Sequence, residues 1–245
     1  MKLFLAGVEG SYSWLPLDES KYILSSYAYI NKGLAEHIKK WDMFLLDSGA
    51  FTFRKKSGSV NWNNYIDGYI KFINEYDVDY FFELDIDNII GYENVLTLRK
   101  KLEQGTGKRC IPVWHTTRGL ENYEQLCREY DYIALGSSTA YKQKENHRLL
   151  KHLLRVAKQN DCRVHGLGFT SKMIKECDFY SVDSTTWDGY RYGTLYLYQN
   201  GNIKTIKPPK NKGLTRNHRA VTTYNFLEWC KYQRYMENHK GVVYS

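Results

Sequence analysis

The chain has 245 residues, of which 42% are hydrophobic and 25% charged, a globular composition with enough apolar side chains for a buried core. The length fits one large domain, such as a single (β/α) barrel, better than two small ones. Five scattered cysteines without a Cys-x-x-Cys pair exclude a disulfide framework and a zinc knuckle, and the formal net charge of +8 favours a polyanionic partner, although a solubilising surface would carry the same charge.

The first residues predict a strand and not a targeting segment. Met1–Val8 is apolar but far shorter than a signal peptide or a membrane span. We therefore expect a soluble protein of the cytoplasm that has no part in a membrane.

Short apolar runs alternate with longer amphipathic segments along most of the chain. The runs that predict strands are Lys2–Val8, Met43–Phe51, Tyr80–Ile86, Cys110–His115, Tyr132–Gly136, Arg163–Gly168 and Phe179–Ser184. Helical periodicity marks Trp62–Tyr76, Tyr92–Gln104, Leu120–Tyr130, Glu145–Asn160 and Ser171–Cys177. Near-continuous apolar strands separated by helices are typical of a parallel sheet. No Gly-x-Gly-x-x-Gly follows the first strand, which favours an α/β fold of the closed (β/α)8 TIM-like barrel type over an open doubly wound sheet.

The last part of the chain has a different pattern. Gly193–Ile206 alternates apolar and polar residues around Asn200-Gly201, which predicts a β-hairpin. Lys204–Arg219 is basic, contains Pro208-Pro209 and predicts a loop, and Thr222–Asn238 predicts a final amphipathic helix. We expect these elements of residues 193–245 to pack on the barrel, so that residues 1–245 form a single domain.

Reactive groups of a (β/α) barrel stand at the carboxyl ends of its strands. Three predicted strand ends present carboxylates, at Asp47, Asp85 and Asp183, and the others present mainly glycine or small polar residues that leave room for a planar ligand. Two carboxylates that face one bond are the usual means of cleaving a glycosidic linkage, because one attacks the anomeric carbon and the other donates a proton to the leaving group. A third carboxylate can accept hydrogen bonds from the edge of a base.

Each aspartate has an alternative role as the cap of the helix that follows its strand. This alternative is stronger for Asp87 than for Asp47, because Gly49 admits the close approach of a ligand beside Asp47. His115 and His165 could in principle bind a metal together with Asp85 or Asp183, but no pair has the spacing of a metal site. We therefore interpret them as hydrogen-bonded pocket residues and expect neither a metal nor another cofactor.

These residues give the chain a resemblance to the tRNA-guanine transglycosylase superfamily, the queuine and archaeosine enzymes, and above all to its short phage-type members that act on guanine in DNA. Asp47-Ser48-Gly49-Ala50-Phe51 resembles the signature Asp-Ser-Gly-Gly-Phe-Gln, and Asp85 stands where the family has a base-recognising aspartate. The other similar stretches are Ala134-Leu135-Gly136-Ser137, His165-Gly166-Leu167-Gly168 and Phe179–Gly193, the last of which contains Asp183 at the place of the nucleophile.

The chain also departs from the superfamily. Ala50 and Thr52 replace a glycine and a glutamine, Trp114-His115 stands in place of Gln-Gly, and Ser184-Thr185-Thr186-Trp187 replaces Pro-Thr-Arg. The Cys-x-Cys-x-x-Cys…His zinc subdomain of the tRNA enzymes is missing, because only Cys230 follows Asp183. We therefore expect an altered choice of base, and DNA as substrate.

The resemblance implies a pentosyltransferase that replaces guanine with a 7-deazaguanine base such as preQ0 or preQ1. Asp183 would be the nucleophile and Asp47 the general acid/base. The implied base-binding residues are Ser48, Gly49, Phe51, Asp85, Trp114, His115, Gly136, Ser137, Gly166 and Gly168. A phage-encoded enzyme of this kind would act in the cytoplasm of the host.

The nucleic acid is expected to contact aromatic and basic residues, namely Trp187, Arg191, Lys204, Lys207, Lys210, Lys212, Arg216 and Arg219. Tyr12, Trp14, Phe51, Trp114 and Trp187 are candidates for stacking on a base, and core packing is an equal alternative for Phe51. Three other functions stay open: a tRNA-guanine transglycosylase, a hydrolytic N-glycosylase and a non-catalytic nucleic-acid-binding paralogue. The oligomeric state is open too, and a monomer is compatible with the missing zinc region.

Overall fold

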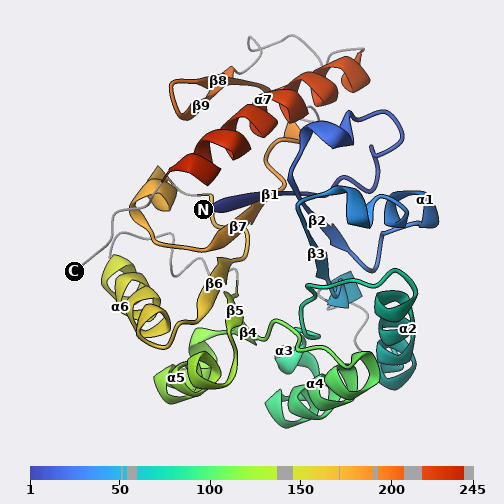
Figure 1. The fold of residues 1–245 in the computed structure, drawn as a ribbon, viewed down its shortest axis with the longest axis vertical. Coiled ribbons are helices and arrows are strands. Elements are labelled where there is room, and N and C mark those ends of the chain that lie inside the picture. Colours follow the sequence, from blue (N-terminus) through green and yellow to red (C-terminus); the bar gives the residue numbers. More distant parts are fainter. Residues whose placement is uncertain are drawn as a thin grey trace.

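The structure, a computed structural model, describes residues 1–50, 52–53, 60–136, 146–170, 172–189, 193–206 and 217–239. Within these residues seven strands form one parallel sheet in the order β3-β2-β1-β7-β6-β5-β4. The strands are β1 (Lys2–Ala6), β2 (Tyr22–Ser26), β3 (Met43–Asp47), β4 (Val113–Trp114), β5 (Tyr132–Leu135), β6 (Arg163–Gly166) and β7 (Ser181–Ser184). The sheet curls into a half-barrel, and helices lie around its outer side (Figure 1).

The connections between these parallel strands contain the helices. The α-helices are α1 (Lys32–Ala35), α2 (Trp62–Glu75), α3 (Asp87–Ile90), α4 (Tyr92–Thr106), α5 (Gly119–Glu129), α6 (His147–Gln159) and α7 (His218–Asn238). The 3-10 helices are η1 (Leu17–Glu19), η2 (Ile38–Lys40), η4 (Thr116–Arg118) and η7 (Lys172–Glu176). A hairpin of β8 (Leu195–Gln199) and β9 (Asn202–Ile206) precedes α7. None of the helices in the described ranges is long and apolar enough to cross a membrane.

The sheet is not the closed (β/α)8 barrel that the sequence predicts. The expected strand at Tyr80–Ile86 makes only isolated bridges in the described part of the chain, from Phe81 to Leu46 and from Phe82 to Ile111. The next hydrogen bond toward β4 is made by a side chain and not by the backbone: Glu83 Oε1 accepts the hydrogen bond of the Val113 N–H at 2.8 Å. The segment therefore links the two edges of the half-barrel without adding a regular strand.

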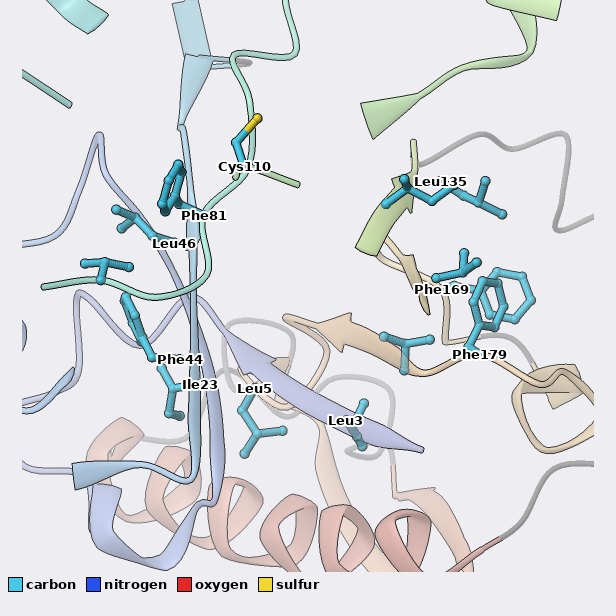
Figure 2. Close-up of a cluster of buried hydrophobic side chains, with 14 of the residues drawn as sticks. Leu3, Leu5, Ile23, Phe44, Leu46, Phe81, Cys110, Leu135, Phe169 and Phe179 are labelled. Carbon is cyan, nitrogen blue, oxygen red and sulfur yellow. The ribbon is translucent and has the colours of Figure 1, made fainter. Parts of the chain in front are cut away.

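Alternation along the strands divides the buried apolar residues into an inner and an outer cluster. The inner cluster fills the half-barrel and consists of Phe4, Ala6, Tyr22, Leu24, Met43, Leu45, Phe82, Ile111, Val113, Tyr132 and Ala134. The outer cluster includes Leu3, Leu5, Ile23, Phe44 and Leu46 and joins the sheet to the surrounding helices (Figure 2). Because both faces of the strands are buried, the sequence shows near-continuous apolar runs.

The helices cover the sheet through amphipathic faces with defined ends. α6 buries Leu150, Leu153, Leu154 and Ala157, which recur at intervals of three and four residues. α2 begins after Asn61, whose side chain accepts a hydrogen bond from the Asn64 N–H at 3.1 Å. α4 ends at Gly107, which has a left-handed φ of 66° that favours glycine.

The C-terminal hairpin and helix are confirmed. Asn200 and Gly201 have φ values of 49° and 75°, as the two-residue turn of a hairpin requires. α7 begins at His218 and not at Thr222, and the Asn217 side chain accepts a hydrogen bond from the Ala220 N–H at 3.1 Å. This cap sets the true start of the helix.

β2 is the strand that the sequence analysis missed. Only Tyr22, Ile23 and Leu24 are apolar in it, and serine and lysine residues flank them. A run of three apolar residues does not stand out from a loop, whereas in the structure β2 lies between β1 and β3 and is held by both.

Gln233 fastens α7 to the sheet. Its side chain is fully buried and donates hydrogen bonds to Leu3 O at 2.8 Å and Tyr22 O at 2.9 Å. Its Oε1 accepts a hydrogen bond from the Lys21 N–H at 2.8 Å. One amide therefore satisfies backbone groups at the start of two strands.

We predict that Gln233→Leu lowers the free energy of unfolding by about 3 kcal/mol, because buried backbone groups lose their partners. Urea denaturation monitored by circular dichroism measures the change. The matched control is Gln125→Leu on α5, an exposed residue, which should change the free energy by less than about 0.5 kcal/mol. Equal midpoints for the two variants would show that α7 does not depend on this contact.

Candidate active site

Two aspartates stand near the carboxyl ends of their strands on the inner side of the half-barrel. Asp183 pairs with Phe4 of β1, and continued pairing through β2 aligns Phe4 with Met43 of β3. Asp47 lies four positions beyond Met43, three strand steps away from β7. Because the strands of a barrel-like sheet are tilted, paired residues are displaced along the barrel axis by about one residue per strand. Over the three strand steps this displacement offsets most of the four positions. The carboxylates of Asp47 and Asp183 therefore lie at nearly the same level along the axis.

Asp183 is held by two N–H donors. Its Oδ1 accepts a hydrogen bond from the Gly168 N–H at 2.7 Å and lies 3.2 Å from His165 Nε2. Only 12% of the side chain is exposed. The two hydrogen bonds that the described residues make to Asp183 both end on Oδ1.

Asp47 is held by the turn that follows it. Its Oδ2 accepts a hydrogen bond from the Gly49 N–H at 3.1 Å. Gly49 has a φ of +69°, and a Cβ at this position would lie 2.8 Å from the backbone nitrogen of Ala28. Glycine is therefore required here by the backbone itself and by the close approach of the turn after β2.

The pKa of Asp47 is raised to about 6. Burial is the largest cause, the charges of Asp183, Asp85 and Glu9 add to it, and the hydrogen bond from Gly49 opposes it. Three other carboxylates are therefore close enough for their charges to disfavour the ionised form of Asp47. A carboxyl group with a pKa of about 6 can both donate and accept a proton near neutral pH.

Asp85 and His115 form an ion pair in this group. His115 Nε2 lies 2.6 Å from Asp85 Oδ1, and about a quarter of each side chain is exposed. Burial lowers the pKa of His115, but the hydrogen bond and the charge of Asp85 outweigh it, so the net pKa is raised above 6.5. A Cβ at Gly136 would clash with the His115 ring, so glycine makes room here for the histidine.

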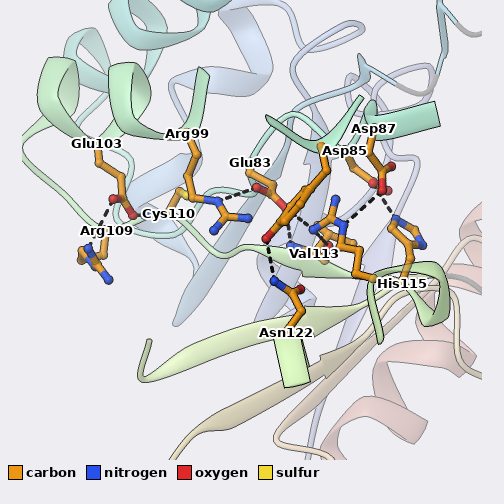
Figure 3. A network of polar contacts seen from close by, with 12 residues as sticks. Glu83, Asp85, Asp87, Arg99, Glu103, Arg109, Cys110, Val113, His115 and Asn122 are labelled. Atoms are coloured by element: carbon orange, nitrogen blue, oxygen red, sulfur yellow. Dashed lines mark hydrogen bonds and ion pairs between the residues drawn. The ribbon is translucent and has the colours of Figure 1, made fainter. Parts of the chain in front are cut away.

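A network of buried charges fixes the segment that carries Asp85 (Figure 3). Glu83 has no exposed side-chain surface and pairs with Arg99 at 2.7 Å and with Arg118 at 3.2 Å. Arg118 also donates hydrogen bonds to Asp87 Oδ2 at 3.1 Å and to Val113 O at 2.5 Å. The network ties this segment to β4 and α4.

Among the residues that the structure describes, Asp85, Asp87 and His115 form a group that could hold a metal ion. Their ligand atoms lie within 4.8 Å of one another. Two of these ligands already face each other as the pair of Asp85 and His115, and Arg118 occupies one oxygen of Asp87. Asp87 is also the first residue of α3 and not its cap, which is Ile86. The expected absence of a metal stays a prediction.

Glu9 is a site residue that the sequence analysis did not select. It follows β1, and its Oε1 accepts hydrogen bonds from Ser25 Oγ and from the Ser26 N–H, both at 2.7 Å. A signal existed, because Glu9 comes shortly after the first apolar run, as Asp85 does in its own segment. Its partners on β2 were not visible, since that strand was not predicted.

Two tryptophans that were expected to contact the substrate lie in the core. Trp114 is 1% exposed and donates a hydrogen bond to Gly119 O at 2.9 Å. Trp187 has no exposed surface and donates a hydrogen bond to Ala6 O at 2.8 Å. Neither ring offers a face to a base, so the expected stacking role of Trp114 and Trp187 is not supported. They fill the outer cluster between sheet and helices.

Two further predicted residues, Ser48 and Gly166, are buried and have packing contacts. Ser48 is 2% exposed, and its carbonyl oxygen accepts a hydrogen bond from Tyr65 OH at 2.6 Å. A Cβ at Gly166 would lie 3.0 Å from the Phe179 ring, so this glycine makes room for the core. Phe51 and Ser137 lie outside the described residues.

The expected nucleic-acid interface is described only at its two ends. Lys204 on β9 and Arg219 on α7 are exposed, and the Arg219 guanidinium lies 4.9 Å from the centre of a Trp14 ring. The remaining residues of this set lie outside the described ranges: Arg191, Lys207, Lys210, Lys212 and Arg216. Contact with a nucleic acid stays a prediction.

Comparisons with protein-family models and with curated proteins find no match for this chain. The resemblance to the transglycosylase superfamily therefore rests on its motifs, and the chemistry has to be argued from the geometry of the site.

We predict that the Asp47 carboxyl titrates with a midpoint near pH 6, as followed by its ¹³C chemical shift. Asp183→Asn should lower this midpoint, because it removes a negative charge that opposes the ionisation of Asp47. Asp42→Asn, an exposed residue just before β3, should leave it unchanged. A wild-type midpoint near the ordinary value of 3.8 would contradict the grouping of the carboxylates.

Proposed function

We propose that this protein is a base-exchange transglycosylase that replaces guanine in DNA with a 7-deazaguanine base through a covalent glycosyl-aspartate intermediate. The observation that carries the proposal is the pair of Asp183 and Asp47, two carboxylates in unlike surroundings, of which the charge of Asp183 raises the pKa of Asp47. Asp183 accepts N–H hydrogen bonds and suits a nucleophile, whereas Asp47 has a pKa of about 6 and suits a general acid and base.

The first half-reaction breaks the bond between the target guanine and its sugar. The nucleotide leaves the stack, as base-modifying enzymes require. Asp183 Oδ2 attacks C1′, the electrons of the C1′–N bond leave with guanine, and protonated Asp47 gives its proton to the departing base. The products are free guanine, an ionised Asp47 and a covalent bond between C1′ and Asp183.

The second half-reaction reverses these steps with a different base. Ionised Asp47 takes a proton from the incoming base, whose nitrogen then attacks C1′. The bond from C1′ to Asp183 breaks, and its electrons return to the carboxylate. One glycosidic bond is lost and one is formed, so the exchange needs no external source of free energy.

Asp85 and His115 are the proposed readers of the base. His115 engages Oδ1 of Asp85, which leaves Oδ2 as an acceptor for N–H groups. The edge of guanine or a 7-deazaguanine presents adjacent N–H donors, and the Asp85 carboxylate held by His115 matches them. Glu9 adds a second acceptor near Asp47.

DNA is the proposed polymer because nothing in the chain corresponds to the zinc subdomain of the tRNA enzymes. Cys230, the cysteine that follows Asp183, lies in α7, and burial raises the pKa of its thiol to about 12. A thiol with this pKa is not poised to bind a metal as thiolate. The exposed Lys204 and Arg219 favour a phosphate backbone, and binding should weaken steeply with salt.

We predict that radiolabelled guanine enters guanine-containing DNA in the presence of the wild-type protein but not of Asp183→Asn.

The rate of covalent-complex formation should fall as pH rises through about 6, because only protonated Asp47 can donate to the leaving base. Asp47→Asn should lower the rate by at least about 100-fold and remove this pH dependence. Asp42→Asn is the matched control. Full exchange by Asp183→Asn would contradict the proposed roles.

The same assay separates the other functions. Abasic sites without incorporation would indicate a hydrolytic N-glycosylase that uses water as acceptor, and label in tRNA alone would indicate a tRNA enzyme. DNA binding without a covalent complex would indicate a non-catalytic binding protein.

A further inference from the structure

A chain of buried polar side chains runs from Asp183 into the half-barrel. His165 Nε2 lies 3.2 Å from Asp183 Oδ1, and His165 Nδ1 lies 2.6 Å from Ser181 Oγ. Ser181 Oγ lies 2.5 Å from Tyr132 OH. His165 and Ser181 have no exposed surface, and Tyr132 is 3% exposed. Polar groups this deep in an apolar interior are costly unless each has a partner, and here each has one.

The His165 ring has little freedom to move. It lies between the rings of Phe4 and Phe82, with centroid distances of 6.0 Å and 5.3 Å. His165 and Ser181 are paired residues on the neighbouring strands β6 and β7. Ser181 and Asp183 are two residues apart on β7 and so face the same side, which lets one imidazole bridge them.

The donors and acceptors of this chain have one consistent order when Asp183 is ionised and His165 is neutral. A carboxylate only accepts, so His165 Nε2 must carry the hydrogen. Nδ1 is then an acceptor, and the Ser181 hydroxyl donates to it. The Ser181 oxygen in turn accepts from Tyr132. Burial raises the pKa of Tyr132 far above 10, which keeps its hydroxyl a donor.

We propose that Tyr132, Ser181 and His165 form a donor chain that holds the His165 ring at Nδ1 and thereby fixes the orientation of the attacking carboxylate at Nε2. The proposal rests on the proposed role of Asp183 as nucleophile. With Nε2–H and the Gly168 N–H both on Oδ1, the carboxylate cannot rotate, and Oδ2 faces the substrate. The three residues are positioning residues, because they act through Asp183.

The loss of Ser181 leaves His165 Nδ1 as a buried acceptor without its hydroxyl donor. Asp183 still selects the Nε2–H tautomer, because a carboxylate only accepts. One end of the imidazole is then no longer held, so the ring and the carboxylate that it positions gain freedom to move. Ser181→Ala and Tyr132→Phe break the chain at different links, and Tyr132→Phe keeps the ring that fills the interior.

The test measures the hydrogen bond at His165 Nδ1 and the kinetics of these variants. In ¹⁵N NMR spectra the wild type should show the Nε2–H form of His165 with a hydrogen-bonded Nδ1. In Ser181→Ala the Nδ1 resonance should move toward that of an imidazole nitrogen without a hydrogen bond. In the exchange assay Ser181→Ala should lower kcat by about 10- to 100-fold with KM little changed, and Tyr132→Phe by a smaller factor. Ser181→Thr, which keeps the hydroxyl, should restore kcat.

Tyr123→Phe is the matched control. Tyr123 is 1% exposed, and its hydroxyl donates a hydrogen bond to Leu153 O at 2.8 Å in the outer layer. The variant loses a buried hydroxyl of the same kind and should lose stability, but the His165 Nδ1 resonance and kcat should not change.

An unchanged His165 Nδ1 resonance in Ser181→Ala, or a kcat equal to that of Tyr123→Phe, would overturn the donor chain. The NMR measurement needs no turnover, so it tests the donor chain even when the wild type fails to exchange bases. Failure of the proposed function is seen separately, as the absence of label in DNA.

Discussion

The site depends on the contacts of the buried Glu83 carboxylate. This carboxylate accepts a hydrogen bond from the Val113 N–H in place of a further backbone hydrogen bond of the sheet, and it forms ion pairs with Arg99 and Arg118. A buried charge that loses its partner costs about 3–5 kcal/mol, so such a network tolerates little change. Through it the segment that carries Asp85 is locked to β4, and the two edges of the half-barrel stay together.

The fold brings several carboxylates near Asp47, and the repulsion between their negative charges helps to raise its pKa. Asp47 and Asp183 lie in β3 and β7, Glu9 follows β1, and Asp85 lies in the bridging segment, and the charges of the other three act on Asp47. Each carboxylate has different partners: Asp183 has N–H donors, Asp85 has His115, and Glu9 has the end of β2. Asp47 accepts one hydrogen bond from Gly49, and burial, followed by the charges of its neighbours, raises its pKa to about 6.

The inner face of the half-barrel serves stability and chemistry at once. Phe4 and Phe82 belong to the inner apolar cluster and also confine the imidazole beside Asp183. Tyr132 belongs to the same cluster and ends the donor chain with a hydroxyl that burial keeps protonated. The packing that excludes water from the interior is thus the packing that orders its few polar groups.

The sequence by itself determined the α/β class, most helices and strands, the hairpin at Asn200-Gly201, and the aspartates at the strand ends, because hydrophobic period and turn residues are local signals. Tertiary structure alone decided that Tyr80–Ile86 makes bridges and no regular strand, since the Glu83 side chain replaces a backbone hydrogen bond to Val113, a residue far away in the sequence. It also decided that Trp114 and Trp187 are core residues, that Glu9 lies near Asp47, and that His165, expected as a pocket residue, contacts Asp183 and Ser181. Which side of a strand faces the interior, and what its side chain meets there, depends on residues far away in the chain.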